Sequence, residues 1–339
     1  MSYQRDELQQ VEPDRLAVGQ GSRANPYVFL VGTPRSGTTM LKRMINAHPL
    51  IAITRETHWI PDHFEKQNGV DAQGRITAEI VDALYGYHRF EQLKLDRERL
   101  EEMIAHKPHM TYAALVTLIF DLYGLRKHKP LVGDKTPCYV SKLPLLHALW
   151  PQAKFIHLIR DGRDVCLSML NWRMAHKDVG RFSTWERDPI VTTALWWKAL
   201  VGIGRQQGLA LGSNQYLEVT YDSLVEKSEA ECRRFAQFLN VDYHDSMHNY
   251  YLGRTQSAEN MSANAAWLPP TPGMRNWRTE MFPEDVAKFE AAAGNLLEDL
   301  GFDLSPQGIT AEIKENVAGI RAQFRIEALA RKWRLPEIW

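Results

Sequence analysis

A loop at residues 32–39, with the sequence GTPRSGTT, has the composition of an anion-binding site. The apolar residues 27–31 before it are typical of a buried parallel strand, and a helical pattern begins at Thr38. A strand, a glycine-containing loop and a helix start present backbone N–H groups and a helix dipole to an anion. The two glycines have P-loop spacing, but Thr38 stands where the Walker pattern requires lysine, and the basic residue is Arg35. The sequence therefore predicts an anion cradle that is not an NTPase site.

A second candidate anion site follows the apolar run KFIHLI at residues 154–159, which predicts a strand. Arg160 stands at the carboxyl end of this strand, the edge at which open α/β sheets bind ligands. Ser168 lies about two turns into the following helix and can offer a hydroxyl from the same side. A guanidinium with a hydroxyl suits a phosphate group. The alternative is a surface salt-bridge cluster at the Asp-Gly turn of residues 161–162.

These motifs together resemble the sulfotransferases that use 3′-phosphoadenosine 5′-phosphosulfate (PAPS). The motif TPRSGTT resembles the 5′-phosphosulfate loop of the bacterial and Golgi branches, which include the tyrosylprotein sulfotransferases. Arg160 with Ser168 resembles the 3′-phosphate motif of the same family. Tyr221 matches a family tyrosine that contacts the nucleotide just after a strand, and Arg275 with Trp277 resembles a late loop that closes over it.

The resemblance covers about residues 27–300 and implies PAPS as the sulfuryl donor. It implies a nucleotide site formed by Arg35, Ser36, Gly37, Thr38, Thr39, Arg160, Ser168, Tyr221 and Arg275.

Sulfuryl transfer to a hydroxyl needs a base for the acceptor proton and cations for the departing nucleotide. Glu56 follows the predicted strand 50–53. It lies in the segment RETHWIP, which resembles the catalytic segment of the tyrosylprotein branch. The cytosolic branch uses as base a histidine in a Lys-Thr-His motif, but this chain has proline after Lys135-Thr136. Glu56 is therefore the predicted base, with His58 as a second candidate; the alternative is a solvated glutamate at a strand end. Lys135 and Arg35 are the predicted catalytic cations.

No metal is expected in this site. His58, Asp62 and His63 lie close together in the sequence, but they match neither the HExxH pattern nor a facial triad. A single sulfuryl group also carries less charge than a triphosphate, so side-chain cations suffice. We expect these residues to line the acceptor pocket.

Strands alternate with helices along the chain, which predicts an α/β fold with a P-loop-type parallel sheet and helices on both faces. The expected strands are residues 27–31, 50–53, 131–133, 154–159 and 215–220. The expected helices include residues 112–125, 189–207, 224–239 and 283–300, with a loop at 255–280.

The expected organisation is one domain with two extensions. Residues 1–26 form an arm, and residues 27–304 form the sulfotransferase domain. A helical insertion at about residues 60–128 shapes the acceptor pocket. Residues 305–339 form an amphipathic helix that folds back or makes a homodimer.

Composition limits the partners of this protein. The 339 residues include 41 Lys and Arg and 41 Asp and Glu, so no global field favours nucleic acid or anionic membranes. The three cysteines are dispersed and form no CxxC motif, which favours a reducing, cytoplasmic location. The polar N-terminus is unlike a signal peptide, and no apolar run approaches the roughly 18 residues of a membrane span. The Golgi branch of the family carries a membrane anchor, so the lack of such a run in this sequence indicates a soluble, bacterial enzyme.

The predicted function is sulfuryl transfer from PAPS to a hydroxyl or amine, with release of 3′-phosphoadenosine 5′-phosphate (PAP). The acceptor is predicted to be a small molecule, a sugar or a lipid-like compound. A first alternative is a P-loop nucleotide or small-molecule kinase, against which the missing Walker lysine argues. A second is a nucleotide-binding relative without catalysis, against which the presence of Glu56 and Lys135 argues.

Overall fold

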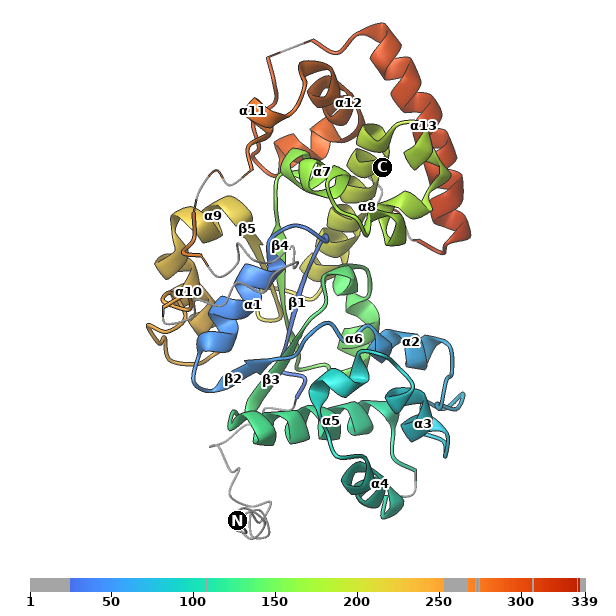
Figure 1. Cartoon of the computed structure of the whole chain (residues 1–339), viewed down its shortest axis with the longest axis vertical. Coiled ribbons are helices and arrows are strands. Elements are labelled where there is room, and N and C mark those ends of the chain that lie inside the picture. Colours follow the sequence, from blue (N-terminus) through green and yellow to red (C-terminus); the bar gives the residue numbers. More distant parts are fainter. Residues whose placement is uncertain are drawn as a thin grey trace.

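A computed structural model of the chain describes residues 25–107, 109–252, 268–271, 273, 275–306, 308–333 and 335. Its centre is a sheet of five parallel strands in the order β2-β3-β1-β4-β5 (Figure 1). The strands are β1 (Val28–Gly32), β2 (Ile51–Ile53), β3 (Leu131–Lys135), β4 (Lys154–Ile159) and β5 (Tyr216–Thr220). The predicted α/β fold with helices on both faces is confirmed.

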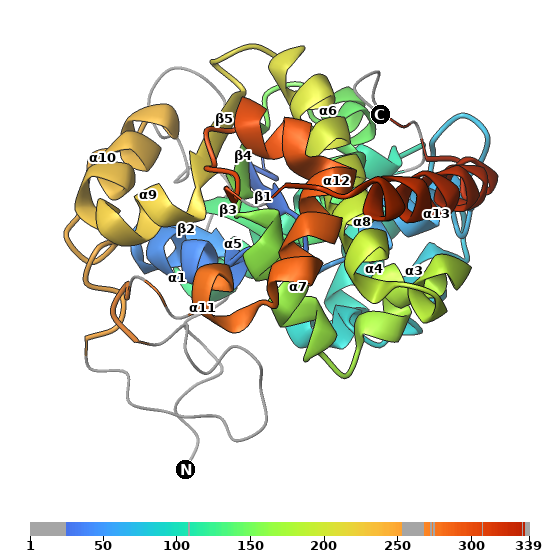
Figure 2. The same cartoon turned by 90° about the horizontal axis from the view of Figure 1, so that it is seen from above.

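Alternating side chains of β1 show how the sheet is covered. Val28 and Leu30 pack into the core under α1, α9 and α10, whereas Phe29 and Val31 face the core under α5 (Tyr112–Lys127), α6 and α8. Figure 2 shows these two layers on either side of the strands. The helices are α1 (Thr38–Ala47), α6 (Leu143–Leu149), α7 (Gly162–Leu170), α8 (Pro189–Leu209), α9 (Tyr221–Glu226) and α10 (Ser228–Phe238).

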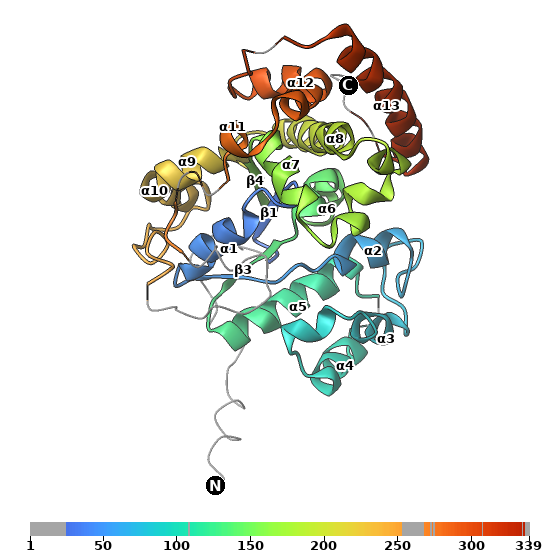
Figure 3. The same cartoon turned by 45° about the horizontal axis from the view of Figure 1, so that its top comes forward.

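The chain between β2 and β3 is a helical insertion at one end of the molecule (Figure 3). Aromatic side chains hold the segments of this insertion together: the ring of Trp59 meets Phe90 at 5.4 Å, and the hydroxyl of Tyr112 donates to the Ile60 carbonyl at 3.0 Å. Its helices are α2 (Trp59–Glu65), α3 (Ile80–Tyr85), the 3₁₀ turn η2 (Phe90–Leu93), α4 (Arg97–Ala105) and α5 (Tyr112–Lys127).

Three short 3₁₀ turns follow α7, and three helices complete the described chain. Helix α12 packs along α8, and α13 packs on both of them. These elements are η4 (Ala175–Lys177), η5 (Val179–Arg181), η6 (Ser183–Glu186), α11 (Trp277–Glu280), α12 (Pro283–Asp299) and α13 (Ala311–Ala330). One further 3₁₀ turn, η3 (Pro137–Ser141), follows β3.

Two expectations on local structure need correction. The helix predicted at residues 224–239 is two helices, because Lys227 leaves the helical conformation at φ −123° and ψ 38°. The loop predicted at residues 255–280 contains α11, whose first turn is capped by the Asn276 side chain. The rest of that loop falls largely outside the described residues, as does the arm up to residue 24. Within the described chain, no helix is long and apolar enough to cross a bilayer.

Candidate active site

A cavity of about 990 Å³ opens at the carboxyl edge of the sheet. It brings together residues that the sequence separates by more than two hundred positions. Of the predicted site residues, its walls contain Arg35, Gly37, Thr38, Thr39, Glu56, Arg160, Ser168, Tyr221 and Arg275. The two predicted phosphate motifs and the predicted base therefore share one cavity.

The anion loop connects β1 to α1. Gly37 adopts φ +94°, and a Cβ at this position would come within 2.6 Å of the Tyr221 ring. Glycine is thus needed both for the turn and for the close approach of the tyrosine, which is the first residue of α9. Arg35, also at positive φ (75°), extends its side chain from the same turn. The loop leaves the first N–H groups of α1 at the cavity.

Ser36 differs from its neighbours in the loop. Its side chain is fully buried, and its hydroxyl is hydrogen-bonded to the Thr33 hydroxyl. Its backbone N–H donates to the Thr33 carbonyl at 3.2 Å. The Ser36 side chain stabilises the turn and does not line the cavity, unlike the threonines that follow it.

Three arginines gather at the donor end of the cavity. The Arg35 Nε donates to the Ser168 hydroxyl at 2.9 Å, and its guanidinium lies 5.4 Å from the Trp172 ring. Burial, and then the charges of Arg275 and Arg160, lower the pKa of Arg35. Like charges placed together in a cavity favour an anionic ligand.

Arg160 is the most enclosed of these cations. Its guanidinium carbon lies 4.2 Å from the centre of the Tyr221 ring, and an Nη2 donates to Asp164 at 3.3 Å. Its Nε is buried and has no hydrogen-bond partner among the described residues. A buried donor without a partner costs free energy, so this atom suits an anionic ligand in the cavity.

Asp164 also connects this site to the late part of the chain. Its Oδ1 accepts from the backbone N–H of Trp277 at 3.0 Å, which fixes the start of α11 next to Arg275. The indole of Trp277 lies over the buried Arg163 guanidinium at 3.6 Å. These contacts bring the predicted arginine-tryptophan loop to the cavity.

Glu56 is the centre of a second charged cluster. Its Oε1 accepts from the Lys135 ammonium at 2.7 Å, and its Oε2 accepts from Arg89 at 2.7 Å and His58 at 3.2 Å. Burial alone would raise the pKa of Glu56, but the bonds from His58, Lys135 and Arg89 outweigh it and hold that pKa well below its usual range. Glu56 is therefore ionised and pairs with Lys135, a contact that the sequence did not indicate.

A buried acid lies beneath this cluster. Asp134 is fully buried next to Lys135 and accepts from the Thr54 hydroxyl at 2.8 Å. Burial raises the pKa of Asp134 to about 6, against the lowering effect of hydroxyl hydrogen bonds. Burial, and then the charge of Lys135, lowers the pKa of Lys42 to about 7. Of these two groups, Lys42 is the one whose pKa depends on the charge of Lys135.

His58 joins Glu56 to a thiol. Its backbone has φ +34°, a conformation that few non-glycine residues adopt, and it immediately precedes α2. Its Nδ1 lies 3.4 Å from the Cys138 sulfur, while Nε2 faces Glu56. Burial raises the pKa of Cys138 to about 12, so the thiol stays protonated.

Arg89 is a functional residue that the sequence did not indicate. It lies between α3 and η2 in the insertion, 33 positions from Glu56, in a stretch without a recognisable motif. Only the packing of the insertion against the sheet brings it to Glu56. Within the described residues, no cluster of three or more histidine, cysteine or acidic side chains could hold a metal ion.

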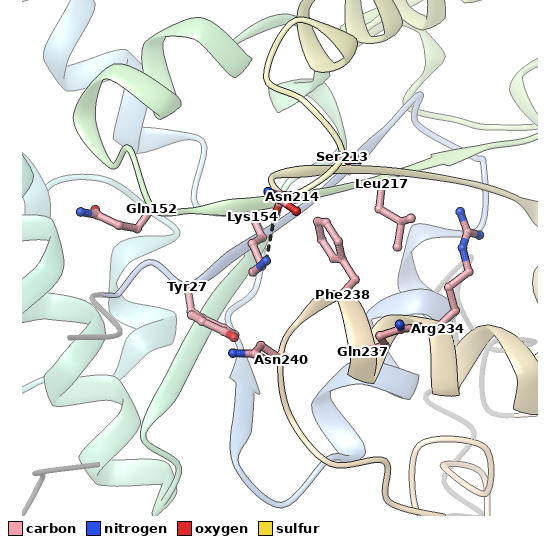
Figure 4. Close-up of a pocket in the computed structure, with 10 residues that line it drawn as sticks. All are labelled: Tyr27, Gln152, Lys154, Ser213, Asn214, Leu217, Arg234, Gln237, Phe238 and Asn240. Carbon is pink, nitrogen blue, oxygen red and sulfur yellow. Dashed lines mark hydrogen bonds between the residues drawn. The ribbon is translucent and has the colours of Figure 1, made fainter. Parts of the chain in front are cut away.

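A second hollow, of about 680 Å³, lies at the opposite edge of the sheet (Figure 4). It is lined by residues before or at the start of β1, β4 and β5, among them Tyr27, Lys154 and Asn214. Lys154 spans it by donating to the Asn214 carbonyl at 2.8 Å. It contains none of the predicted site residues, and the amino ends of parallel strands are not where such sheets bind ligands.

A sequence profile described as the sulfotransferase family matches residues 26–245. The chain belongs to this family. The predicted PAPS-dependent sulfotransferase is thereby confirmed as the class of enzyme, and the kinase alternative loses its support. The match contains both phosphate motifs, Glu56, Lys135 and Tyr221, but it ends before Arg275 and α13.

Curated relatives and solved structures agree with this family. The chain is 24% identical to protein-tyrosine sulfotransferase A of Caenorhabditis elegans, over 83% of this chain and 68% of that protein. It is 25% identical to human protein-tyrosine sulfotransferase 1, over 82% and 70%. The sulfotransferase domain of the Synechococcus PCC 7002 olefin synthase has a TM-score of 0.53 at 22% identity, covering 82% of this chain and 95% of that one. The corresponding domain of the curacin biosynthetic pathway has a TM-score of 0.54 at 21% identity, covering 82% and 98%.

Proposed function

We propose that this enzyme transfers the sulfuryl group of PAPS to a hydroxyl or amine of its acceptor, with Glu56 as base and Lys135 and Arg35 as catalytic cations. The observation that supports this most strongly is the single cavity that joins the anion loop, the Arg160–Ser168 pair and Glu56. The donor supplies the activated sulfur, and PAP leaves. No metal takes part in the proposed reaction.

The residues of the cavity suit the two phosphates of the donor. The start of α1 with Arg35, Thr38 and Thr39 offers N–H groups, hydroxyls and a charge to the 5′ end. Arg160, whose Nε is a buried donor without a partner among the described residues, suits the 3′-phosphate with Ser168. The Tyr221 ring beside Gly37 offers a flat surface.

Glu56 must change its contacts to act as a base. A carboxylate that accepts from Lys135, Arg89 and His58 is ionised but weakly basic, since each contact favours the charged form. If Lys135 turns toward the oxygen that leaves with the nucleotide, Glu56 loses one of these contacts and becomes a stronger base. The proton of the acceptor hydroxyl then passes to Glu56, and the new bond forms between that oxygen and sulfur.

For the acceptor we propose a chemical class. The side of the cavity beyond Glu56 contains Pro61, Tyr87, His88 and Met174, a mixed surface that suits a small-molecule, sugar or lipid-like acceptor. A tyrosine of a peptide is a second candidate, because the curated relatives are named protein-tyrosine sulfotransferases. A cytoplasmic, bacterial setting is also a proposal, which rests on the three dispersed cysteines and the sequence resemblance.

The test is transfer of labelled sulfate from PAPS to a panel of hydroxyl and amine metabolites and tyrosine peptides, with products identified by mass. The Glu56→Gln enzyme should transfer roughly 10²–10⁴-fold more slowly, the usual range for loss of a positioned base. Its affinity for PAP should equal that of the wild type. Glu218→Gln is a matched control, since Glu218 is also half-buried and pairs with Arg205 at 3.1 Å, and neither residue lines the cavity. Normal transfer by Glu56→Gln would move the search for the base to His58.

A further inference from the structure

Helix α13 lies beyond the part of the chain that matches the sulfotransferase family, yet it is firmly packed on the domain. Val317, Ile320, Phe324 and Ala328 are buried, and the helix contacts α8 and α12. Figure 1 shows α13 along the outer edge of these two helices. The predicted amphipathic helix thus folds back on its own chain.

The C-terminal end of α13 forms an aromatic cluster next to the cavity. The rings of Phe182 and Phe324 are stacked at 4.1 Å, and Trp333 meets Phe182 edge-on at 5.5 Å. The backbone N–H of Trp333 donates to the Ala328 carbonyl at 2.9 Å, which ties the tryptophan to the helix end. Trp333 is half-buried and lines the same cavity as Glu56.

The same helix end also holds a second part of the cavity wall. Glu327 accepts from the Ser183 backbone at 3.0 Å, and Arg331 donates to the Arg181 carbonyl. These contacts fix the turns η5 and η6 against α13. Arg181 itself, together with Asp178 from just before η5, lines the cavity.

The opposite wall comes from the insertion. Pro61, Tyr87 and Arg89 line the cavity from that side, and Figures 1 and 3 show the end of α13 coming down toward α2. In the proposed site, the acceptor therefore enters between two walls: one belongs to the helical insertion, and the other is held by the end of α13. Three tryptophans line the cavity, Trp172, Trp196 and Trp333, and Trp333 is the one held by the end of α13.

We propose that Trp333 determines acceptor specificity: the acceptor has a flat apolar body beside its hydroxyl, and this body packs against the indole. This inference rests on the proposed function, because it assigns the cavity beyond Glu56 to the acceptor. It places a specificity residue outside the region that matches the family. Arg331 and Glu327 are positioning residues that hold the wall.

The experiment compares phenol with 2-naphthol, which have similar hydroxyl groups but differ by one fused ring. Both are titrated by calorimetry into the full chain, alone and saturated with PAP. The wild type should bind 2-naphthol about tenfold more tightly, the value expected for burying one additional ring. Trp333→Ala should reduce this preference to less than about threefold, and Trp333→Phe should restore most of it.

Trp185→Ala is the matched control. Trp185 is half-buried in η6, close to the same cluster, but it does not line the cavity. Its loss should leave the preference for 2-naphthol unchanged. Equal binding of the two alcohols by the wild type, or an unchanged preference in Trp333→Ala, would overturn the proposal. The naphthol titration needs no nucleotide, so a failure of PAP to bind would count against the proposed function and not against Trp333.

Discussion

Replacing Arg89 by glutamine tests whether this residue controls the basicity of Glu56. The Arg89 Nη1 donates to Glu56 Oε2 at 2.7 Å, and the two side chains are 33% and 30% exposed. A hydrogen bond to a charged group contributes about 1.5–3 kcal/mol. Solvent screening at this exposure reduces that to about 1.4 kcal/mol, which equals about one pH unit.

The direction of the effect follows from the contact. Arg89 favours the ionised carboxylate, so it helps to hold the pKa of Glu56 below its usual range. Without Arg89 that pKa rises, and Glu56 becomes protonated at a higher pH. The acid limb of kcat/KM should therefore move up by about one pH unit in Arg89→Gln. The rate at neutral pH should be kept or increased, since the base is stronger.

Stability provides an independent measurement of the same contact. A glutamate whose pKa is lowered by folding contributes stability above its unfolded pKa of about 4.3, and this contribution disappears as the pH falls through the folded pKa. Arg89→Gln should therefore lower the free energy of unfolding by about 1 kcal/mol at pH 7, and by less in acid. Urea unfolding at several pH values would measure this.

Arg97→Gln provides the control for both measurements. Arg97 lies in the same insertion and pairs with Asp82 and Glu101, far from Glu56 in the contact network. Its pH profile should equal that of the wild type. If Arg89→Gln instead loses activity about a hundredfold at all pH values with an unmoved acid limb, Arg89 contacts the acceptor, and the argument from Glu56 basicity is refuted.

Three further predictions concern the donor site, metal and α13. PAP should bind more tightly than 5′-AMP by about 2–4 kcal/mol, and Arg160→Ala should remove most of this difference; equal affinities in calorimetry of the wild type would contradict two phosphate sites. Activity should survive EDTA, because side-chain cations face the donor; loss on chelation with recovery in Mg²⁺ would favour a metal-dependent reaction. Truncation after Ser305 should lower the melting temperature and solubility, because α13 covers α8 and α12 with four buried side chains; an unchanged melting curve would show that the helix contributes nothing to the fold.

The elements that place the donor residues could be predicted because they are local. The strand that ends at Ile159 and the helix that begins at Thr38 have the predicted bounds, and residues next to strand ends reach the same sheet edge. Arg160 and Glu56 could be assigned to one site on this rule alone. The rule needs no knowledge of side-chain packing.

The residues that the sequence did not reveal depend on contacts between distant segments. Arg89 reaches Glu56 only because the insertion packs on the sheet, and Trp333 reaches the cavity only because α13 folds back over α8. Neither has a motif around it. Ser36 shows the opposite limit: its motif was recognised, but the turn directs its hydroxyl to Thr33 and not to the cavity.

Lys135 makes the two halves of the proposed reaction depend on each other. Its side chain is only 8% exposed, so its ammonium has few alternatives to the Glu56 carboxylate at 2.7 Å. The same ammonium is assigned to the departing nucleotide, and a single ammonium shared between two anions holds each of them less strongly. Before the donor binds, Glu56 is therefore a weak base, and a water molecule beside it is poorly activated. Once Lys135 has a second anionic partner, Glu56 becomes more basic at the moment when a sulfuryl group is present to be transferred. In the proposed mechanism the ion pair thus couples the basicity of Glu56 to the binding of the donor, by a charge balance that needs no movement of the backbone.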